Sequence, residues 1–420
     1  MRMKRIAICM DGTWQKLRQD RPTNINIISR SVSLHAGEVQ QIVIYTPGVG
    51  STLDALKGVQ SGISGFAASL GSFIGGVFGD GLEDAILDTY LRLAFNYEPG
   101  DEIYIFGFSR GAFSARSLAA LIGKCGILSR RYADKAGDAF ELYRDPDCTP
   151  DSGRAVEFRT AYGKQLGDAV GADRRDFRPQ VSYLGIFDTV GQRGLPSALG
   201  PLSDWGNAKY AFHDLDLGGH VRAARHALAI DERRSAFPPT FWTNLDALNA
   251  KSAASGGPRD AFEQRWFVGA HGDIGGGNPS TLSSFPLAWI VDGAERAGLA
   301  FDRAAHSPLT QTQLPVCLDP AQQITRSRFP KSLNPINWPG RWRSIADLKE
   351  PVARDIAEAT LHNSVALRTA SPTLRRRPYK PPPLKYYMPA LQEIAGPVAL
   401  MATLVDLVNQ PQKKKRGWFG

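Results

Sequence analysis

Cysteine is scarce in this sequence, which has only Cys9, Cys125, Cys148 and Cys317 among its 420 residues. The four lie far apart and form neither a CxxC pair nor another metal-ligand spacing. Scaffolds held together by disulfides or zinc need clustered cysteines. We therefore expect free thiols from a reducing compartment, and neither a zinc site nor a disulfide framework.

Long apolar runs are also missing. The run from Ile6 to Met10 is interrupted by Asp11 and is too short for a secretory signal. The longest uncharged stretch, 58–79, contains seven glycines, which makes it a poor bilayer-spanning helix. The sequence predicts neither export by the general secretory route nor a transmembrane span.

The charge is unbalanced, because 50 Lys and Arg residues face 41 Asp and Glu residues, for a net charge of +9. Such an excess suits an anionic partner, either lipid headgroups or nucleic acid. The sequence has no recognisable nucleic-acid-binding motif, so we expect no nucleic-acid partner. Much of the excess lies late in the chain, in "RRRPYKPPPLKYY" and "KKKR".

Short apolar runs predict buried parallel strands, because turn-forming residues and then helical patterns follow them. The predicted strands are 5–10, 41–46, 102–108, 181–187 and 264–270. Apolar residues at helical spacing predict a helix over 82–97, a second from Ser109 to about Ile122 and a third from Pro286. This alternation predicts a doubly wound, mostly parallel α/β sheet, with its ligand site at the carboxyl ends of the strands.

We expect the core to span residues 1–300, with a polar, helix-prone insertion at about 128–180 that we interpret as a cap. Residues 301–391 are expected to be a C-terminal extension of the same domain, in which only 352–368 has a clear helical pattern. Residues 392–420 form a separate apolar and basic tail.

A serine lies between two glycines where one predicted strand meets a helix, in "IYIFGFSRGAFSAR". Gly107, Ser109 and Gly111 form the pattern G-x-S-x-G, in which a sharp turn lifts the serine hydroxyl above the end of a sheet. The strand before the pattern and the helix after it supply the required context. We predict that Ser109 is a nucleophile; the alternative is a purely structural glycine turn.

A serine nucleophile needs a base, and in this fold the acid and the histidine follow it in that order. His271, in "RWFVGAHGDIGGG", is the downstream histidine that ends a predicted strand, whereas the others have polar or helical surroundings typical of the surface. We predict that His271 is the base. The alternative is a core histidine beside a glycine turn.

Asp188 ends the strand "VSYLGIF" and is therefore expected at the same edge of the sheet, where its carboxylate would orient the imidazole. Two rivals remain. Asp273 is too near His271 in sequence to reach the back of its ring easily, although a supporting role stays open, and Asp231 adjoins two arginines that would pair with it.

An acyl-transfer site also needs donors for an oxyanion. The backbone N–H of Arg110, which follows the predicted nucleophile, is one candidate. We expect the second donor in "DGTW" after the first strand, at the N–H of Gly12 or Thr13. For Asp11, a catalytic contribution and a turn or capping role are equally open.

Seven segments together resemble one family in their order along the chain. They are "CMDGTW", "YTPGVGS", "GFSRGAFSAR", "GIFDTVG", "ALAIDERRSAF", "GAHGDIGGG" and "LHNSVALR", and the resemblance covers about residues 4–370. The family is the α/β-hydrolase domain named after the catalytic domain of type VI secretion phospholipase effectors, so the resemblance implies an α/β-hydrolase-like fold with an inserted helical cap and a C-terminal extension. The resemblance implies lipase or phospholipase chemistry with a Ser-Asp-His triad, carried here by Ser109, Asp188 and His271.

The sequence thus predicts a serine hydrolase of carboxylic esters, a phospholipase or lipase, with no metal or organic cofactor. The alternative is a non-catalytic binding or scaffold module that associates with membranes. We expect a protein of the cytoplasm of the producing cell; the resemblance also implies, for some members, delivery into another cell, where an immunity protein would be a partner.

Two segments carry membrane-related predictions. In 58–79, small residues at every fourth position and interleaved phenylalanines fit either a mobile apolar lid or a buried glycine-rich connection. Residues 396–420 join an apolar helical stretch to four basic residues, Trp418 and Phe419, which fits peripheral contact with an anionic membrane or a docked helix with a charged end.

Overall fold

The structure is a computed structural model. It describes residues 3–12, 15, 17, 20–48, 81–166, 174–190, 216–234, 237–314, 318–325, 342–345, 350–371, 374 and 377–394. The predictions for Thr13, for the segment 58–79 and for the tail 396–420 lie outside the described residues. Cys9, Cys125 and Cys148 are free and buried.

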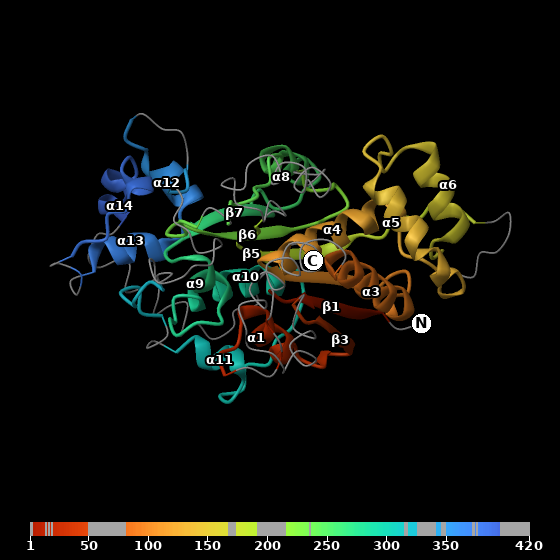
Figure 1. Cartoon of the computed structure of the whole chain (residues 1–420), viewed down its shortest axis with the longest axis horizontal. Helices are drawn as coiled ribbons and strands as arrows, with labels where there is room; N and C mark the ends of the chain where they lie inside the picture. The colour runs from red at the N-terminus through yellow and green to blue at the C-terminus, as the bar shows by residue number, and fades with distance from the viewer. Residues whose placement is uncertain are drawn as a thin grey trace, which may run out of the picture.

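The described residues form a seven-stranded sheet at the centre of the molecule, in the order β2-β3-β1-β4-β5-β6-β7 (Figure 1). The strands are β1 Lys4–Met10, β2 His35–Ala36, β3 Val39–Thr46, β4 Glu102–Phe108, β5 Val181–Phe187, β6 Ala224–Ala229 and β7 Phe262–Phe267. The short β2 runs antiparallel to β3, and the other neighbouring strands are parallel. The predicted mostly parallel α/β sheet is confirmed.

The chain reverses its direction of winding between two adjacent strands, β1 and β4. From β1 the chain continues to β3 on one side, and from β4 it continues to β5 on the other. Ligands of open α/β sheets bind at such a switch point, outside the carboxyl ends of the strands. Ser109 follows β4 directly and therefore lies at this point.

The five predicted strands all exist, but the last ends earlier than expected. β7 stops at Phe267 rather than at residue 270, and Gly269 adopts a φ of +118° in the turn that follows. The strand β6, "ARHALA", was not predicted because it contains Arg225 and His226. Both are buried, since Arg225 pairs with Glu263 and His226 bonds to Gln264 on the neighbouring strand.

Helices cover both faces of the sheet. The Tyr104 hydroxyl donates to the carbonyl of Ala297, just after α10 (Ser284–Arg296), which places Tyr104 on the face covered by that helix. Gly107 instead faces α4 (Arg110–Cys125), because a Cβ added there would lie 2.6 Å from the Cα of Ala112. Successive side chains of a strand point to opposite faces. Hence α4 and α10 lie on opposite sides of β4.

The remaining helices flank this centre. They are α1 Asn24–Ser31, α3 Gly81–Asn96, η3 Arg130–Lys135, α5 Ala136–Arg144, α6 Gly153–Tyr162, α8 Leu245–Ala254, α9 His271–Gly275, α11 Pro308–Thr312, α12 Arg354–Thr360, α13 Asn363–Ala370, η8 Pro382–Leu384 and α14 Met388–Ile394. Among the described residues, no helix is long and apolar enough to cross a bilayer.

The single helix predicted over 352–368 is wrong, because α12 and α13 are separate. Between them, Leu361 is extended and forms a parallel bridge with Trp266 of β7, and the N–H of His362 donates to the carbonyl of Trp266. Pairing with the end of the sheet therefore interrupts a helical pattern. Tertiary contact outweighs local propensity here.

The insertion expected to be a cap does not cover the carboxyl ends of the strands. Its helices α5 and α6 lie beyond the opposite end of the sheet (Figure 1). Arg159 of α6 donates to the carbonyl of Lys124 near the last residue of α4, whereas Ser109 precedes the first residue of that helix. A 16-residue helix is about 24 Å long, so α4 separates the insertion from Ser109.

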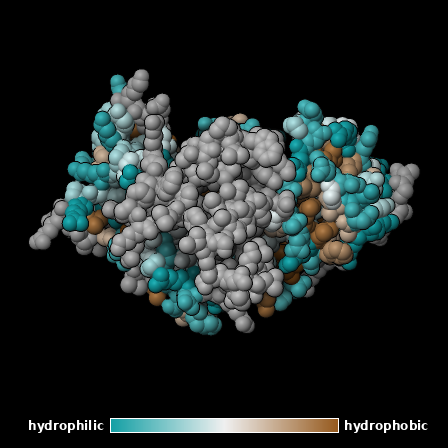
Figure 2. Space-filling view, viewed as in Figure 1, coloured by the Kyte–Doolittle hydropathy of each residue, from teal (hydrophilic) through white to brown (hydrophobic). Residues whose placement is uncertain are grey.

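The C-terminal extension lies at the carboxyl ends instead, where α12, α13 and α14 gather beside β7 (Figure 1). The Tyr379 hydroxyl donates to Asp231, shortly after β6, and Arg343 pairs with Asp188, directly after β5. In the view of Figure 2, the end formed by α12–α14 is mainly hydrophilic, and hydrophobic atoms show near α3, α5 and α6. The extension, not the insertion, reaches the expected ligand site.

Candidate active site

The backbone is strained at two of the residues predicted to act in the site. Among the described residues, Ser109, with a φ of 59°, and Asp188, with a φ of 39°, are the non-glycine residues with positive φ. Strained backbone persists only where the surroundings enforce it and is common at functional sites. A Cβ added to Gly111 would lie 2.2 Å from the carbonyl oxygen of Met10, so the turn after β4 requires glycine there.

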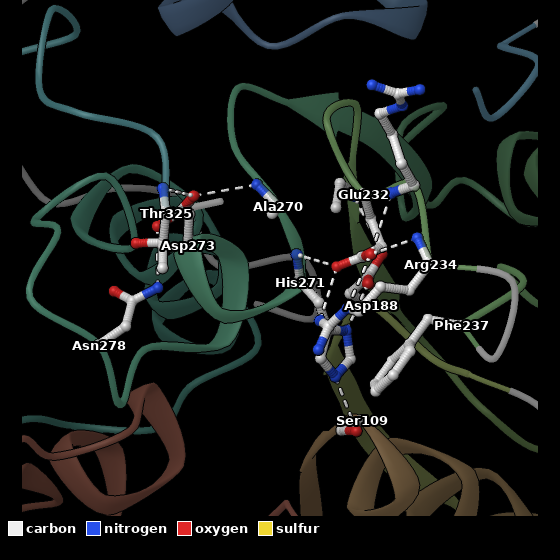
Figure 3. Close-up of polar contacts among 12 residues, drawn as sticks. Ser109, Asp188, Glu232, Arg234, Phe237, Ala270, His271, Asp273, Asn278 and Thr325 are labelled. Atoms are coloured by element: carbon white, nitrogen blue, oxygen red, sulfur yellow. Dashed lines mark hydrogen bonds and ion pairs between the residues drawn. The ribbon is translucent and has the colours of Figure 1, made fainter. Parts of the chain in front are cut away.

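Three side chains from distant parts of the chain form one hydrogen-bonded series (Figure 3). The Oγ of Ser109 lies 2.8 Å from Nε2 of His271, and Nδ1 of the same ring lies 2.6 Å from Oδ2 of Asp188. Asp188 and Ser109 come from the ends of neighbouring strands, and His271 begins α9 after β7. The structure thus brings together the three residues that the sequence analysis selected.

Two aromatic rings pack against the imidazole of His271. The ring centroids of Phe108 and Phe237 each lie 4.8 Å from that of His271. The Arg234 guanidinium in turn stacks over Phe237, 3.9 Å from its centroid. These ring contacts limit rotation of the imidazole, whose Nε2 is directed at Ser109 (Figure 3).

The protonation of the series follows from burial and charge. Burial raises the pKa of Asp188, but the Arg343 guanidinium and the hydrogen bond to His271 lower it by more, so the carboxyl is ionised. Burial lowers the pKa of His271, an effect that the hydrogen bond to Asp188 opposes. The imidazole is therefore neutral at neutral pH and able to accept a proton from a hydroxyl.

Glu232 is a buried carboxylate beside the site that the sequence analysis did not select. Its Oε2 accepts from the backbone N–H of His271 at 3.2 Å, and both its oxygens accept from the Arg234 side chain. Burial raises its pKa, but the Arg234 guanidinium lowers it by more. Its place in the segment "IDERRSAF" was the available signal, although that signal drew attention to Asp231 instead.

Arg343 is the second residue that the sequence analysis missed. Its Nη1 lies 2.6 Å from Oδ1 of Asp188, and its Nη2 lies 3.1 Å from Oδ2. The same guanidinium donates to the carbonyls of Ala229 and Phe237 at 3.0 and 2.7 Å. No motif or periodicity surrounds Arg343 in the sequence, so no local signal pointed to it.

The two rival acids have other partners. Asp273 accepts from the N–H groups of Ala270 and Thr325 and from the Asn278 amide, away from the His271 ring (Figure 3). Asp231 accepts from the Tyr379 hydroxyl and the Gly269 N–H. The expected pairing of Asp231 with its neighbouring arginines is wrong, because Arg234 pairs with Glu232.

Of the predicted oxyanion donors, Arg110 has a position that fits the role, whereas the N–H of Gly12 has another partner. Arg110 is the first residue of α4, so its N–H points away from the carbonyls of its own helix. The N–H of Gly12 already donates to Oδ1 of Asp11 at 2.8 Å, which argues against its use as an oxyanion donor. Burial raises the pKa of Asp11 to about 6, against hydrogen bonds from Tyr45 and Thr23 that lower it. Asp11 thus accepts from the N–H of Gly12 and from the Tyr45 and Thr23 hydroxyls, as a turn residue would, and a catalytic contribution stays a prediction.

Some of the histidines expected at the surface are buried or partly buried. His226 lies fully buried in β6, where its Nε2 accepts from the N–H of Thr189. His220 contacts the carbonyl of Ala119, and His362 stacks on Phe267 with its ring centroid 4.3 Å away. Burial lowers the pKa of each of these three histidines. Of the others, His306 is exposed as expected, and His213 lies outside the described residues.

Ser109 lies on a strained strand-to-helix turn, and its hydroxyl is hydrogen-bonded to the His271 imidazole, which is hydrogen-bonded to the buried Asp188 carboxylate. This arrangement is able to activate a serine hydroxyl as a nucleophile. The mostly parallel α/β sheet and this site together define the class of α/β-hydrolase-like proteins. Within the described part of the chain, no group of three metal-ligating side chains occurs.

Residues 4–293 match the family model described as the catalytic domain of Tle1-like phospholipase effectors of the type VI secretion system (T6SS). The match covers most of the chain, which therefore belongs to this family, as the resemblance predicted. Arg343 and the helices α12–α14 lie beyond the matched range.

Individual proteins are more distantly similar. The uncharacterised protein YEL023C of Saccharomyces cerevisiae is 30% identical over 251 residues, which are 58% of this chain and 33% of that protein. This chain thus spans about a third of that relative. The structure of an uncharacterised protein from Pseudomonas aeruginosa has a TM-score of 0.36 and 17% identity, over 71% of this chain and 47% of that one.

The structure of the Tle1 effector bound to the VgrG spike has a TM-score of 0.32 and 19% identity to this chain. The alignment covers 66% of this chain and 52% of that one. Both TM-scores are too low to support an argument about function.

Proposed function

We propose that the protein is a serine hydrolase that cleaves carboxylic esters of lipids, with Ser109 as nucleophile, His271 as general base and Asp188 as the acid that orients it. The observation that carries the proposal is the hydrogen-bonded series from Ser109 Oγ through His271 to Asp188, with distances of 2.8 and 2.6 Å. Family membership supports the choice of lipid esters.

The proposed reaction has two steps. Ser109 Oγ attacks the acyl carbonyl while His271 Nε2 takes its proton, and His271 then gives this proton to the leaving alcohol. Asp188 stabilises the imidazolium formed between these transfers. Water, deprotonated by His271, then attacks the acyl-enzyme and releases the fatty acid.

The developing oxyanion needs donors, of which we propose the backbone N–H of Arg110 as one. The hydrogen bond from Gly12 to Asp11 leaves the N–H of Thr13 as the remaining candidate from "DGTW". Thr13 lies outside the described residues, so the second donor stays a prediction.

A fluorophosphonate reports on the proposed nucleophile, because it labels activated serines covalently. We expect one label on the peptide that contains Ser109, and none in Ser109→Ala. Ser114→Ala is the matched control, since Ser114 lies buried in the same helix, α4, and should leave labelling unchanged. Labelling that persists in Ser109→Ala would contradict the assignment.

The products identify the scissile bond. Mixed phospholipid vesicles incubated with the protein should release free fatty acid and lysophospholipid, measured by mass spectrometry, and Ser109→Ala should release neither. Absence of turnover on every ester tested, with retained binding to vesicles, would instead favour a non-catalytic binding module.

The place of action is part of the same proposal. Membership in a family of secretion-system effectors supports delivery into another cell, where an immunity protein would protect the producer. Peripheral membrane contact through residues 396–420 is a separate prediction, because these residues lie outside the described part. Deleting them should reduce sedimentation with anionic liposomes, and unchanged sedimentation would refute the contact.

A further inference from the structure

The carboxylate of Asp188 has more partners than an orienting acid needs. Besides its contact with His271, it accepts hydrogen bonds from both terminal nitrogens of Arg343 and, at 3.0 Å, from the N–H of Ala229. Both partners of the ion pair are buried, since the side chains of Arg343 and Asp188 are 4% and 0% exposed. A buried, bidentate contact between a guanidinium and a carboxylate is strong and fixes the orientation of the carboxylate.

Arg343 reaches this position from the C-terminal extension, beyond the residues that match the family model. Neighbouring contacts fasten this part of the extension to the site. The Arg233 guanidinium lies over the Trp342 ring, 4.8 Å from the ring centroid. Arg343 donates a hydrogen bond to the carbonyl of Phe237, whose ring packs on His271.

We propose that Arg343 is a positioning residue of the active site, which fixes the Asp188 carboxylate and weakens the basicity of His271 through it. The inference rests on the proposed function, because it assigns a role in the same reaction. It makes the extension a required part of the site rather than an addition to a complete catalytic domain.

The chemical consequence concerns the proton on His271. An orienting carboxylate stabilises the imidazolium by its negative charge. Here the guanidinium contacts both oxygens of that carboxylate, so part of this charge is offset at the ring. His271 should therefore stay unprotonated to a lower pH than it would beside an unpaired aspartate, and the nucleophile should remain active there.

Other charges that face His271 form a second balanced pair. Glu232 accepts from the N–H of His271 and raises the pKa of the ring, whereas Arg234, paired with Glu232, lowers it. The charge of Arg343 also lowers the pKa of Glu232. The direct contact of Arg343 is with both oxygens of Asp188, so we expect that pair to account for most of any change in the proton affinity of His271 in an Arg343 variant.

The chain supplies a matched control arginine in Arg159 of the insertion. Arg159 also holds an aspartate with two nitrogens, at 2.5 and 2.7 Å from Asp176, and also donates to two backbone carbonyls, of Lys124 and Pro150. Its side chain is 0% exposed. It has the same chemistry as Arg343 but no contact with the series Ser109–His271–Asp188.

The test is the rate of Ser109 labelling by a fluorophosphonate as a function of pH, which needs no knowledge of the natural substrate. In Arg343→Gln we expect the acid limb of the profile to move upward by roughly one pH unit, because a neighbouring cation has been removed. We also expect the plateau rate to fall roughly 10- to 100-fold, as for other residues that orient a reacting group.

Arg343→Lys keeps the charge and should retain more of the wild-type acid limb than Arg343→Gln. Arg159→Gln should keep the wild-type limb. The inference is overturned if Arg343→Gln has the wild-type limb, or if Arg159→Gln shows the same shift. A wild-type protein without a label at Ser109 would instead overturn the proposed function.

A loss of folding is distinguished by chemical rescue. Arg343→Ala leaves a space the size of the missing guanidinium, and millimolar guanidinium should restore part of the labelling rate and of the acid limb. The same addition should not help Arg159→Ala. Failure of guanidinium to act on a folded Arg343→Ala protein, judged by its circular dichroism, would contradict a positioning role.

Discussion

Two regions outside the central sheet hold a buried arginine against an aspartate in nearly the same way. In the insertion, Arg159 pairs with Asp176, and in the extension Arg343 pairs with Asp188. The first pair joins α6 to the end of α4, and its aspartate side chain is 33% exposed. The second lies beside His271, and its aspartate side chain is 0% exposed.

The comparison shows that the effect of a buried arginine–aspartate pair depends on its position in the fold. Buried ion pairs bring little net stability, but removal of one partner is costly because the other is left uncompensated. At the insertion this cost concerns only the anchoring of helices. At the extension, loss of the arginine would also leave uncompensated the carboxylate that contacts His271. Only the pair at the carboxyl ends of the strands therefore affects the proposed reaction.

The largest expected difference between the two pairs lies in their aspartates. Asp188→Asn should lower hydrolysis by about 10⁴-fold, because an amide neither stabilises the imidazolium nor fixes the correct tautomer. Asp176→Asn should change it by less than about twofold, as substitutions away from a site usually do. Initial rates on a soluble ester measure both. Comparable losses in the two variants would break the comparison.

Two glycines, Gly111 of the turn after β4 and Gly137 of the insertion, should respond in opposite directions to replacement by alanine. Gly111→Ala would place a Cβ 2.2 and 2.4 Å from the backbone oxygens of Met10 and Asp11, which are unable to move aside as a flexible side chain would. We expect a loss of about 3 kcal/mol or more in the free energy of unfolding. Denaturant titration followed by circular dichroism measures it, and an unchanged midpoint would contradict the close approach of α4 to β1.

Asp11 is a buried carboxylate that accepts hydrogen bonds from hydroxyls, and its pKa shift can be compared with that of Asp188. The pKa of Asp11 is raised from 3.8 to about 6, so its ionised form destabilises the folded state, with the cost absent below pH 3.8 and complete above pH 6. The shift of about 2 units corresponds to about 3 kcal/mol. Relative to wild type, Asp11→Asn should gain stability by about this amount as the pH rises through that interval.

The matched control for Asp11 is Asp188→Asn, for which the sign is opposite. Because the folded-state pKa of Asp188 is lowered, its ionised form stabilises the folded protein above the ordinary pKa of an aspartate, and this stability is lost as the pH falls. Relative to wild type, this variant should therefore lose stability as the pH rises. Thermal unfolding at several pH values compares the two variants, and the same sign in both would refute the role given to Arg343.

The smallest expected effect concerns Gly137 in α5 of the insertion. Beyond its chain neighbours and the backbone of its own helix, a Cβ there meets no atom within 4 Å, so Ala replaces glycine without a clash. Alanine favours the helix by up to about 1 kcal/mol. Gly137→Ala should raise the midpoint of denaturant unfolding slightly and leave the hydrolysis rate unchanged. Destabilisation would show that the insertion packs more closely than the structure describes.

Much of the sheet could be predicted from sequence because buried parallel strands are nearly continuous apolar runs. Every residue of β5, from Val181 to Phe187, is buried. The strand β6 escaped prediction because Arg225 and His226 interrupt its apolar pattern, and their burial depends on partners from other elements. The break between α12 and α13 likewise depends on contact with Trp266.

The sequence alone determined the local features of this protein: its strands, the glycine-flanked turn at Ser109, and the position of Asp188 and His271 near strand ends. Each has a signature within a few residues, because steric limits and periodic burial act locally. Only the tertiary structure decided that the extension, rather than the insertion, reaches these residues. The contact of Arg343 with Asp188 joins residues 155 positions apart, and pairing over that separation depends on how the whole chain packs.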